Sequence, residues 1–245
     1  MIFEASEFVF VPPPLISRAR RVLIKPNVVD SQPYPVSTNR EMLGSVIDSI
    51  KRVSDADIII LEGTSTEEPI YPIYKALGYD FPRVLMLDVK DCIWVEVENP
   101  LPHPFAIATF WVPNVVISSD YLISITPHRI SGTSGLFTIK NLLSLLPVSK
   151  YKASNSGGWG SLNEFGLDKV FADLYFTLPF DLGIIDARQK LFCEEGKLKG
   201  KVEKFGKVLA GEPFEIDHEA SKLDGLTGEY LDLIEAGKSE LETWG

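Results

Sequence analysis

Charged and amide side chains follow the strand-like stretches of this sequence, one or two at each stretch. They are Lys25 and Asn27 after "VLI", Glu62 after "DIIIL", His128 and Arg129 after "YLISITP", and Asp186 after "LGII". In a sheet of parallel strands, ligands bind beyond the carboxyl ends of the strands. A single polar residue at such a point is ordinary turn chemistry. Four such ends predict one shared cleft in which these side chains meet.

Lys140 and Asn141 stand together inside the apolar stretch "GLFTIKNLLSLLP" (135–147). The spacing predicts a helix on which this pair forms a narrow polar stripe. A lysine can extend past apolar surface to water, but a buried asparagine needs hydrogen-bond partners. We therefore expect the stripe to line the cleft, with Lys140 as a catalytic residue and Asn141 binding substrate. The alternative is an ordinary helix whose lysine reaches solvent.

The "IKPN" stretch favours an anionic ligand. Pro26 restricts the backbone of Lys25, so a rigid turn could direct the ammonium of Lys25 and the amide of Asn27 at one molecule. Both residues are therefore candidate substrate-binding groups. The alternative is a plain turn that ends a strand.

A second anion-binding element is predicted in "HRISGTSG" (128–135), ahead of the predicted helix. Backbone N–H groups of such a loop, together with a helix N-terminus, favour negative charge. His128 and Thr133 are accordingly candidate substrate-binding residues. A simple helix cap explains the hydroxyl groups as well. Neither nucleotide fingerprint, GxxxxGK[ST] or GxGxxG, is present.

Asp186 and Asp217 are the candidate catalytic carboxylates. Asp217 lies in "EIDHEA" (215–220), at the predicted start of a helix. The two could exchange protons with a substrate or bind a divalent metal ion such as Mg²⁺, since carboxylates suit hard cations. For Asp217 the alternative is helix capping, because acids near a helix N-terminus interact favourably with its dipole. The histidines show no metal-ligand spacing, so the cofactor is left unknown.

Composition and charge exclude several classes of protein. The formal net charge of −10 repels phosphate backbones, so no nucleic-acid partner is predicted. Two widely separated cysteines provide no cluster motif, so we expect no iron–sulfur cluster ligated by this chain alone. No apolar run is long enough for a membrane span, and the N-terminus lacks the basic leader of a secretory signal. We expect a cytoplasmic, soluble protein.

Strand-like and helical stretches alternate along most of the chain. Strands are predicted at 21–29 and 56–63, and between them a helix at 37–53 in which Thr38 and Glu41 have capping-box spacing. This order is typical of a parallel sheet covered by helices.

The stretch 83–118 differs, because three strand-like segments follow one another with little helix between them. It predicts an antiparallel hairpin section. The expected fold is a single α/β domain over residues 1–245, with a mostly parallel or mixed sheet flanked by helices. "ASNSGGWGS" (153–161) predicts a flexible loop.

Several of these stretches together resemble the domain of unknown function 362 family. They are "IKPNVV", "ADIIILEGTS", "SDYLISITPHRISGTSGLFTIKNLLSLLP", "DLGIIDARQKLFCEEG" and "KVLAGEPFEIDHEASKLDGL". The most distinctive element is the lysine–asparagine pair that follows a strand and a glycine–threonine loop. The resemblance implies a cytoplasmic α/β domain, and it implies no established reaction. The motif positions that it matches are Lys25, Asn27, Lys140, Asn141, Asp186 and Asp217.

The chain departs from the family pattern in three places. "ITPHRIS" stands where the family usually has a lysine–threonine–histidine stretch, so His128 is displaced from that position. "VSKYKASNSGG" lacks a histidine that commonly follows the pair, and the ferredoxin-like cysteine module of some relatives is absent. Electron transfer would therefore need a redox partner protein.

The leading hypothesis is an enzyme, or a former enzyme, that acts on a small anionic molecule such as a carboxylate or phosphate ester. The alternative is a non-catalytic binding module, or a protein that depends on a redox partner. The oligomeric state stays open.

Overall fold

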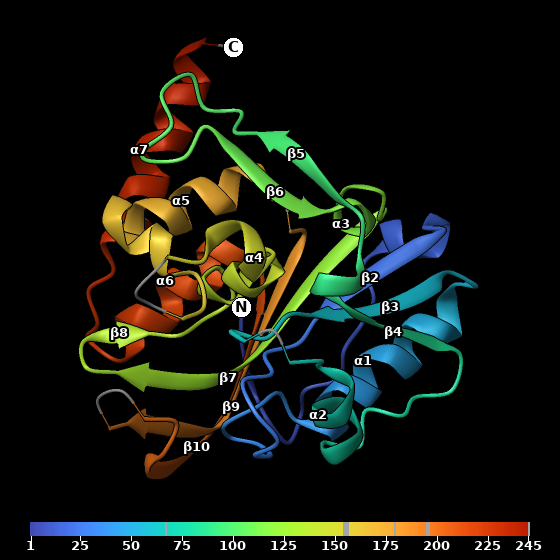
Figure 1. The fold of residues 1–245 in the computed structure, drawn as a ribbon. Coiled ribbons are helices and arrows are strands. Elements are labelled where there is room, and N and C mark those ends of the chain that lie inside the picture. The colour runs from blue at the N-terminus through green and yellow to red at the C-terminus, as the bar shows by residue number, and fades with distance from the viewer. Residues whose placement is uncertain (67, 154–156, 179, 195–196, 245) are drawn as a thin grey trace.

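A computed structural model describes residues 1–66, 68–153, 157–178, 180–194 and 197–244. Within these residues the main sheet has eight strands in the order β1-β10-β9-β7-β2-β3-β4, with β8 paired to β7 (Figure 1). The strands are β1 (Ile2–Glu4), β2 (Arg21–Lys25), β3 (Asp57–Glu62), β4 (Val84–Asp88), β7 (Tyr121–Ser131), β8 (Ser134–Gly135), β9 (Leu182–Cys193) and β10 (Gly200–Gly211). Strands β4, β3, β2, β7 and β9 run parallel. At one edge β10 pairs antiparallel with β9, and β1 pairs antiparallel with β10.

Helices cover both faces of this sheet. The helical segments are η1 (Pro14–Arg18), α1 (Arg40–Val53), α2 (Tyr71–Ala76), η2 (Val89–Asp91), α3 (Asn114–Ile117), η3 (Lys140–Leu145), α4 (Val148–Tyr151), η4 (Gly160–Phe165), α5 (Leu167–Thr177), α6 (Pro213–Leu223) and α7 (Glu229–Trp244). The apolar stripe of α1 packs on the alternate side chains of β2 and β3, such as Ile24 and Ile60. The opposite side chains, such as Leu23 and Leu61, pack with η3, α5 and α7. Burial on both faces explains why these strands read as continuous apolar runs.

The fold class predicted from the sequence is confirmed. The sheet is mixed and flanked by helices, and residues 83–118 contain an antiparallel hairpin of β5 (Trp94–Glu98) and β6 (Thr109–Pro113). The hairpin forms its own two-stranded sheet, whereas β4, at the start of the same section, joins the main sheet in parallel with β3.

The predicted helix at 135–147 is wrong for most of its length. Strand β7 continues to Ser131, and Gly132, whose φ of 59° suits a tight turn, lets the chain return as β8. Helical structure begins only at Lys140, as the six-residue 3₁₀ segment η3. The glycine-rich stretch is therefore a hairpin turn and does not lead into a helix N-terminus.

Two further local predictions change. The cap of α1 is Asn39, whose side chain accepts hydrogen bonds from the backbone N–H groups of Glu41 and Met42. The hydroxyl of Thr38 instead donates to the carbonyl of Ile125, at 2.7 Å. Of the predicted flexible loop at 153–161, residues 154–156 lie outside the described residues, and Gly160 already belongs to η4.

Strand lengths decide where the polar side chains lie. Strands β2 and β3 have five and six residues, while β7 and β9 have eleven and twelve. In the register, Lys25 stands opposite Ser124, whereas Asp186 pairs with Pro127 further along. His128 and Asp186 are thus inside long strands and not beyond the ends of short ones. None of the helices in the described ranges is long and apolar enough to cross a lipid bilayer.

Candidate functional site

The candidate site lies at the topological switch point of the sheet. Strand β2 has β3 on one side and β7 on the other, all three parallel, so the chain leaves β2 in one direction and later returns on its opposite side. Ligand sites in α/β proteins favour the crevice beyond the carboxyl ends of strands at such a point. Lys25 ends β2 and Glu62 ends β3.

Lys25 forms a buried ion pair with Glu62. Its ammonium donates to Glu62 Oε1 at 2.6 Å, to Asn141 Oδ1 at 3.0 Å and to the Pro26 carbonyl at 2.9 Å. Both charged side chains are fully shielded from solvent. Burial lowers the pKa of Lys25 and raises the pKa of Glu62, and the attraction between the two charges opposes both shifts.

The Glu62 carboxylate is held by further donors. Ser144 Oγ donates to Oε1 at 2.6 Å, the Gly63 N–H to Oε1 at 3.0 Å, and the Val28 N–H to Oε2 at 2.9 Å. A carboxylate fixed by this many hydrogen bonds is an anchor for the loops around it. It also offsets the charge of Lys25.

Asn141 and Asn27 extend the network toward β7. Asn141 Oδ1 also accepts from the Asn27 amide at 2.9 Å, and the Asn141 amide donates to Ser124 Oγ at 3.0 Å. Asn27 Oδ1 in turn accepts from Arg129 Nη2 at 2.6 Å. We call Lys25, Asn27, Glu62, Arg129 and Asn141 the switch-point cluster.

Arg129 gives this cluster an excess of positive charge. Its side chain is 3% exposed, and its Nε and Nη1 atoms are buried without a hydrogen-bond partner. Burial lowers the pKa of Arg129, although a guanidinium stays charged at neutral pH. Among the described residues no carboxylate lies within ion-pair distance of it. Lys25 is thus paired with Glu62, while Arg129 is attracted by Glu62 and Asp30 only from beyond ion-pair distance.

A cleft of about 160 Å³ adjoins the cluster. Asn27 and Asn141 form part of its wall, together with Lys140 and the loop that follows β3. The full lining is Asn27, Val28, Val29, Gly63, Ser65, Lys140, Asn141, Leu143, Ser144 and Trp159. The cleft combines amide and hydroxyl groups with a few apolar side chains, as expected of a small-molecule site.

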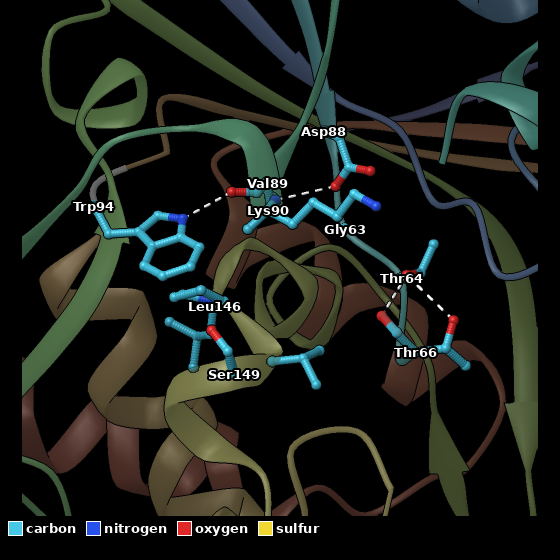
Figure 2. A pocket seen from close by; sticks show the side chains of 11 residues that line it. Gly63, Thr64, Thr66, Asp88, Val89, Lys90, Trp94, Leu146 and Ser149 are labelled. Atoms are coloured by element: carbon cyan, nitrogen blue, oxygen red, sulfur yellow. Dashed lines mark hydrogen bonds between the residues drawn. The ribbon is translucent and has the colours of Figure 1, made fainter. Parts of the chain in front are cut away.

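A smaller cavity of about 70 Å³ is lined by Gly63, Thr64 and Thr66 of the loop that follows β3 (Figure 2). Its polar groups are engaged in holding the local backbone. The Asp88 carboxylate accepts from the Lys90 N–H at 3.0 Å, and the Trp94 indole donates to the Val89 carbonyl at 2.8 Å, as Figure 2 shows. The hydroxyl of Thr64 donates to the Thr66 carbonyl at 2.7 Å.

Lys140 lines the cleft but its ammonium points away from Lys25. The ammonium lies 4.7 Å from the ring centre of Tyr230 and 5.3 Å from that of Phe171, and it donates to the Ser134 hydroxyl. Lys140 and Asn141 both line the cleft, but their polar ends have different partners: the ammonium meets Ser134, and the amide group of Asn141 meets Lys25 and Ser124. Burial lowers the pKa of Lys140.

Asp217, on α6, fastens the segment that precedes η3. Its carboxylate accepts from the Thr138 N–H at 2.9 Å, the Thr138 hydroxyl at 2.6 Å and the Ile139 N–H at 2.9 Å. The Tyr230 hydroxyl lies 3.3 Å away. Burial raises the pKa of Asp217 to about 6 in spite of these hydrogen bonds. Asp217 therefore positions the backbone next to Asn141.

Besides Asp217, three predicted site residues are absent from the cleft wall. Asp186 is paired within β9 to Arg188, whose Nη2 donates to it at 2.6 Å. His128 Nε2 lies 2.6 Å from Asp224 Oδ2. Thr133 is exposed in the turn between β7 and β8. The structure thus gathers Lys25, Asn27 and Asn141, as the sequence predicts, and leaves Asp186, His128 and Thr133 elsewhere.

The predicted pairing of Asp186 with Asp217 around a metal ion has no geometric support. Their oxygens belong to separate hydrogen-bond clusters, one with Arg188 and one with Thr138. Within the part of the chain that the structure describes, no group of three or more His, Cys, Asp or Glu side chains could hold a metal ion.

A family model described as a domain of unknown function (DUF362) matches residues 22–222. The chain belongs to this family. The resemblance drawn from the sequence stretches is confirmed by this match.

A search of solved structures adds a similarity of fold to this DUF362 chain. The structure of the lactate racemase apoprotein from Thermoanaerobacterium thermosaccharolyticum superposes with a TM-score of 0.56 at 13% sequence identity, covering 89% of this chain and 53% of that one. The DUF362 chain therefore spans about half the length of that protein, and the likeness concerns the fold alone. No curated protein sequence matches it.

Sequence reasoning missed several residues around the cleft of the DUF362 chain. Ser124 supports Asn141 from inside β7, and Ser144 reaches Glu62 from η3. The helical-wheel position of Ser144, on the same side as Asn141, was a usable signal. Trp159 fell within the predicted flexible loop, and nothing in its immediate neighbours indicates a cleft wall.

Proposed function

We propose that this chain binds a small molecule with a carboxylate or phosphate group in the cleft beside Asn27 and Asn141. The observation that supports the proposal most is the charge imbalance of the switch-point cluster. Lys25 and Arg129 are both buried, Glu62 pairs with Lys25, and Arg129 has only longer-range attraction from Glu62 and Asp30. An unbalanced buried charge is costly, and an anion in the adjoining cleft would offset it.

The cleft wall supplies donors for such an anion. Each side-chain amide carries two N–H groups, and Asn27 uses one of them on Asn141. Its carbonyl oxygen is occupied by Arg129, which fixes the amide with its nitrogen on the opposite side. The hydroxyl of Ser65 also lines the cleft. Hydrogen bonds from these groups would be strengthened by the negative charge of the ligand.

We further propose that the bound anion is a substrate, and that Lys140 exchanges a proton with it. Lys140 lines the cleft, and its lowered pKa brings it closer to the range in which proton transfer is efficient at neutral pH. The similar structure is that of a lactate racemase apoprotein, so lactate, a 2-hydroxycarboxylate, is one suitable probe. A cytoplasmic location is part of the same proposal.

A second candidate is binding without turnover, including binding that serves a redox partner protein. The observation that favours it is the hydrogen-bond saturation of two buried acids near the cleft wall. Glu62 and Asp217 each accept several hydrogen bonds from the protein, which leaves neither of them available as a base.

Isothermal titration calorimetry with acetate, lactate and inorganic phosphate tests the anion site. The informative variant is Arg129→Met, with Lys75→Met, an exposed lysine on α2, as the matched control. We expect at least one anion to bind the wild-type protein and about tenfold weaker binding to Arg129→Met, since one charge-assisted interaction is worth about 1.5–3 kcal/mol. Replacing an unpaired buried cation by an apolar side chain should leave the unfolding free energy unchanged or higher. Equal anion affinities in all three proteins would refute the proposal.

A further inference from the structure

A second, larger groove of about 440 Å³ adjoins the cleft. The two share the lining residues Ser65, Leu143 and Trp159, so a molecule bound in one can extend into the other. The remaining wall includes Leu167 and the glycines at 157, 158 and 160. None of the described residues that line this groove carries a charge.

Trp159 separates the cleft from the groove and is held in place. Its indole N–H donates to the Leu146 carbonyl at 2.7 Å, which fixes the ring at the boundary. Aromatic rings pack well against such a surface through offset or edge contacts.

Gly157 and Gly158 form part of the groove wall without contributing side chains that would fill the groove. A Cβ atom added to Gly157 would meet no heavy atom within 4 Å, so the space beside it is open. Gly158 has a φ of 62° and approaches Ser65, with 3.5 Å between a Cβ added there and the nearest Ser65 atoms. The backbone therefore closes on the loop after β3 without filling the groove.

We propose that the ligand of the cleft carries an apolar group, preferably an aromatic ring, which binds in this groove against Trp159 and Leu143. The inference rests on the proposed anion site and specifies its substrate class, an arylalkyl or alkyl carboxylate or phosphate. The charged end stays beside Asn27, because the groove offers it no compensating charge. The smaller cavity of about 70 Å³ is less suitable, since its volume is limited and the Asp88 carboxylate borders it.

The test compares phenylacetate with acetate, and phenylacetate with the neutral phenylacetamide, by isothermal titration calorimetry. The ring removes a large apolar area from water, so we expect phenylacetate to bind the wild-type protein at least about tenfold more tightly than acetate. Phenylacetamide should bind more weakly than phenylacetate, because it lacks the charge that the cleft favours.

Two variants locate the ring. Gly157→Leu places a side chain in the open space of the groove, and Trp159→Ala removes its aromatic wall. Gly157→Leu should keep the acetate affinity and lose most of the tenfold gain for phenylacetate. Trp159 also lines the cleft, so Trp159→Ala is judged by the ratio of the phenylacetate affinity to the acetate affinity, which should fall toward one. The matched control is Trp244→Ala, which removes a 70% exposed tryptophan at the end of α7. Circular dichroism confirms that each variant is folded.

The possible results separate this inference from the anion site. Equal affinity of the wild-type protein for acetate and phenylacetate overturns the inference and leaves the anion site intact. A gain for phenylacetate that persists in both variants also overturns it, because the ring would then bind elsewhere. Absence of binding by every anion tested, inorganic phosphate included, overturns the inference and the proposed function together.

Discussion

Two polar clusters on the same sheet differ in charge balance. The switch-point cluster holds two cations and one carboxylate beside a cleft. Farther along the sheet, His128 of β7 and Lys190 of β9 meet Asp224. The Asp224 carboxylate accepts from Lys190 and lies 2.6 Å from His128 Nε2. We call these three residues the His128 cluster. The His128 ring packs against Phe137, with 5.0 Å between ring centres. With a neutral imidazole, this second cluster has no net charge.

The difference shows that a polar residue after a strand-like stretch has two possible fates. Where the strand is short, as in β2 and β3, the residue reaches the crevice at the strand ends. Where the strand continues, as in β7 and β9, His128 and Asp186 are enclosed between neighbours and neutralised by them. Arg129, also on β7, instead reaches Asn27 of the switch-point cluster, and its positive charge favours an anionic ligand there.

The largest expected effect comes from Glu62→Gln. It leaves Lys25 buried without its counter-ion, and breaking a buried pair costs about 3–5 kcal/mol of unfolding free energy. Urea denaturation measures this, with Glu235→Gln, an exposed position on α7, as control. The double variant Lys25→Met/Glu62→Leu should recover much of the loss. If Glu62→Gln is as stable as its control, the ion pair between Lys25 and Glu62 does not stabilise the fold.

Asp217→Asn tests whether Asp217, which holds the backbone next to Asn141, makes the unfolding free energy depend on pH. The raised pKa, about 6 against 3.8 for a free aspartate, means that the folded state binds this proton more tightly than the unfolded state. The contribution of Asp217 is therefore greatest at low pH and is lost as the pH rises from 3.8 to about 6. At about 1.36 kcal/mol per pKa unit, the wild-type protein should lose about 3 kcal/mol relative to the variant.

The measurement for Asp217→Asn is the unfolding free energy of both proteins in urea from about pH 4 to about pH 7. A constant difference between them over this range would contradict the predicted pKa shift.

For His128→Gln, the difference in unfolding free energy from the wild type should change with pH in the opposite direction to that of Asp217→Asn. Burial lowers the pKa of His128, so the unfolded imidazole takes up a proton that the folded one resists. Wild-type stability should fall relative to the variant as the pH drops below 6.5. The change should be smaller than for Asp217, because the nearby Asp224 carboxylate partly offsets the burial of an imidazolium.

Urea denaturation of His128→Gln at pH 5 to 8 gives this difference, and His218→Gln, at an exposed position of α6, is the control. Parallel stability curves for wild type and His128→Gln would show that the imidazole titrates as it does in the unfolded chain.

Thr133→Ala should have the smallest effect. The residue is exposed in the turn between β7 and β8, away from the cleft. We expect a change within about 0.5 kcal/mol in unfolding free energy and no change in anion affinity. A loss of anion binding in this variant would restore the turn as a ligand site and remove the distinction drawn between the two clusters.

The sequence was informative where local pattern decides structure. The alternation of apolar strands and amphipathic α1 predicted the mixed sheet, and the spacing of strand-like stretches predicted the β5–β6 hairpin. It also predicted that Lys25, Asn27 and Asn141 lie together. These inferences need only the period of the apolar residues and the rule that parallel strands end on one edge.

Local pattern could not predict the remaining features. The segment 135–147 has the apolar spacing of a helix, but pairing of β8 with β7 and the anchor from Asp217 hold its first half in another conformation. Strand length is similarly set by partners, since β7 and β9 pair with each other along most of their length and β9 also pairs with β10. The conformation of 135–147 and the lengths of β7 and β9 both depend on contacts with residues distant in the sequence, and such contacts override local propensity.

The hydrogen bonds from Thr138 and Ile139 to Asp217 have a consequence for how the protein assembles. The residues of β2, β3 and η3 leave the ribosome well before α6, so the carboxylate that fixes the backbone beside Asn141 arrives last. Until α6 docks, the nascent chain can form the parallel core without a finished ligand site. The backbone beside Asn141 is therefore fixed late in synthesis, and a chain that ends before Asp217 lacks the carboxylate that holds it.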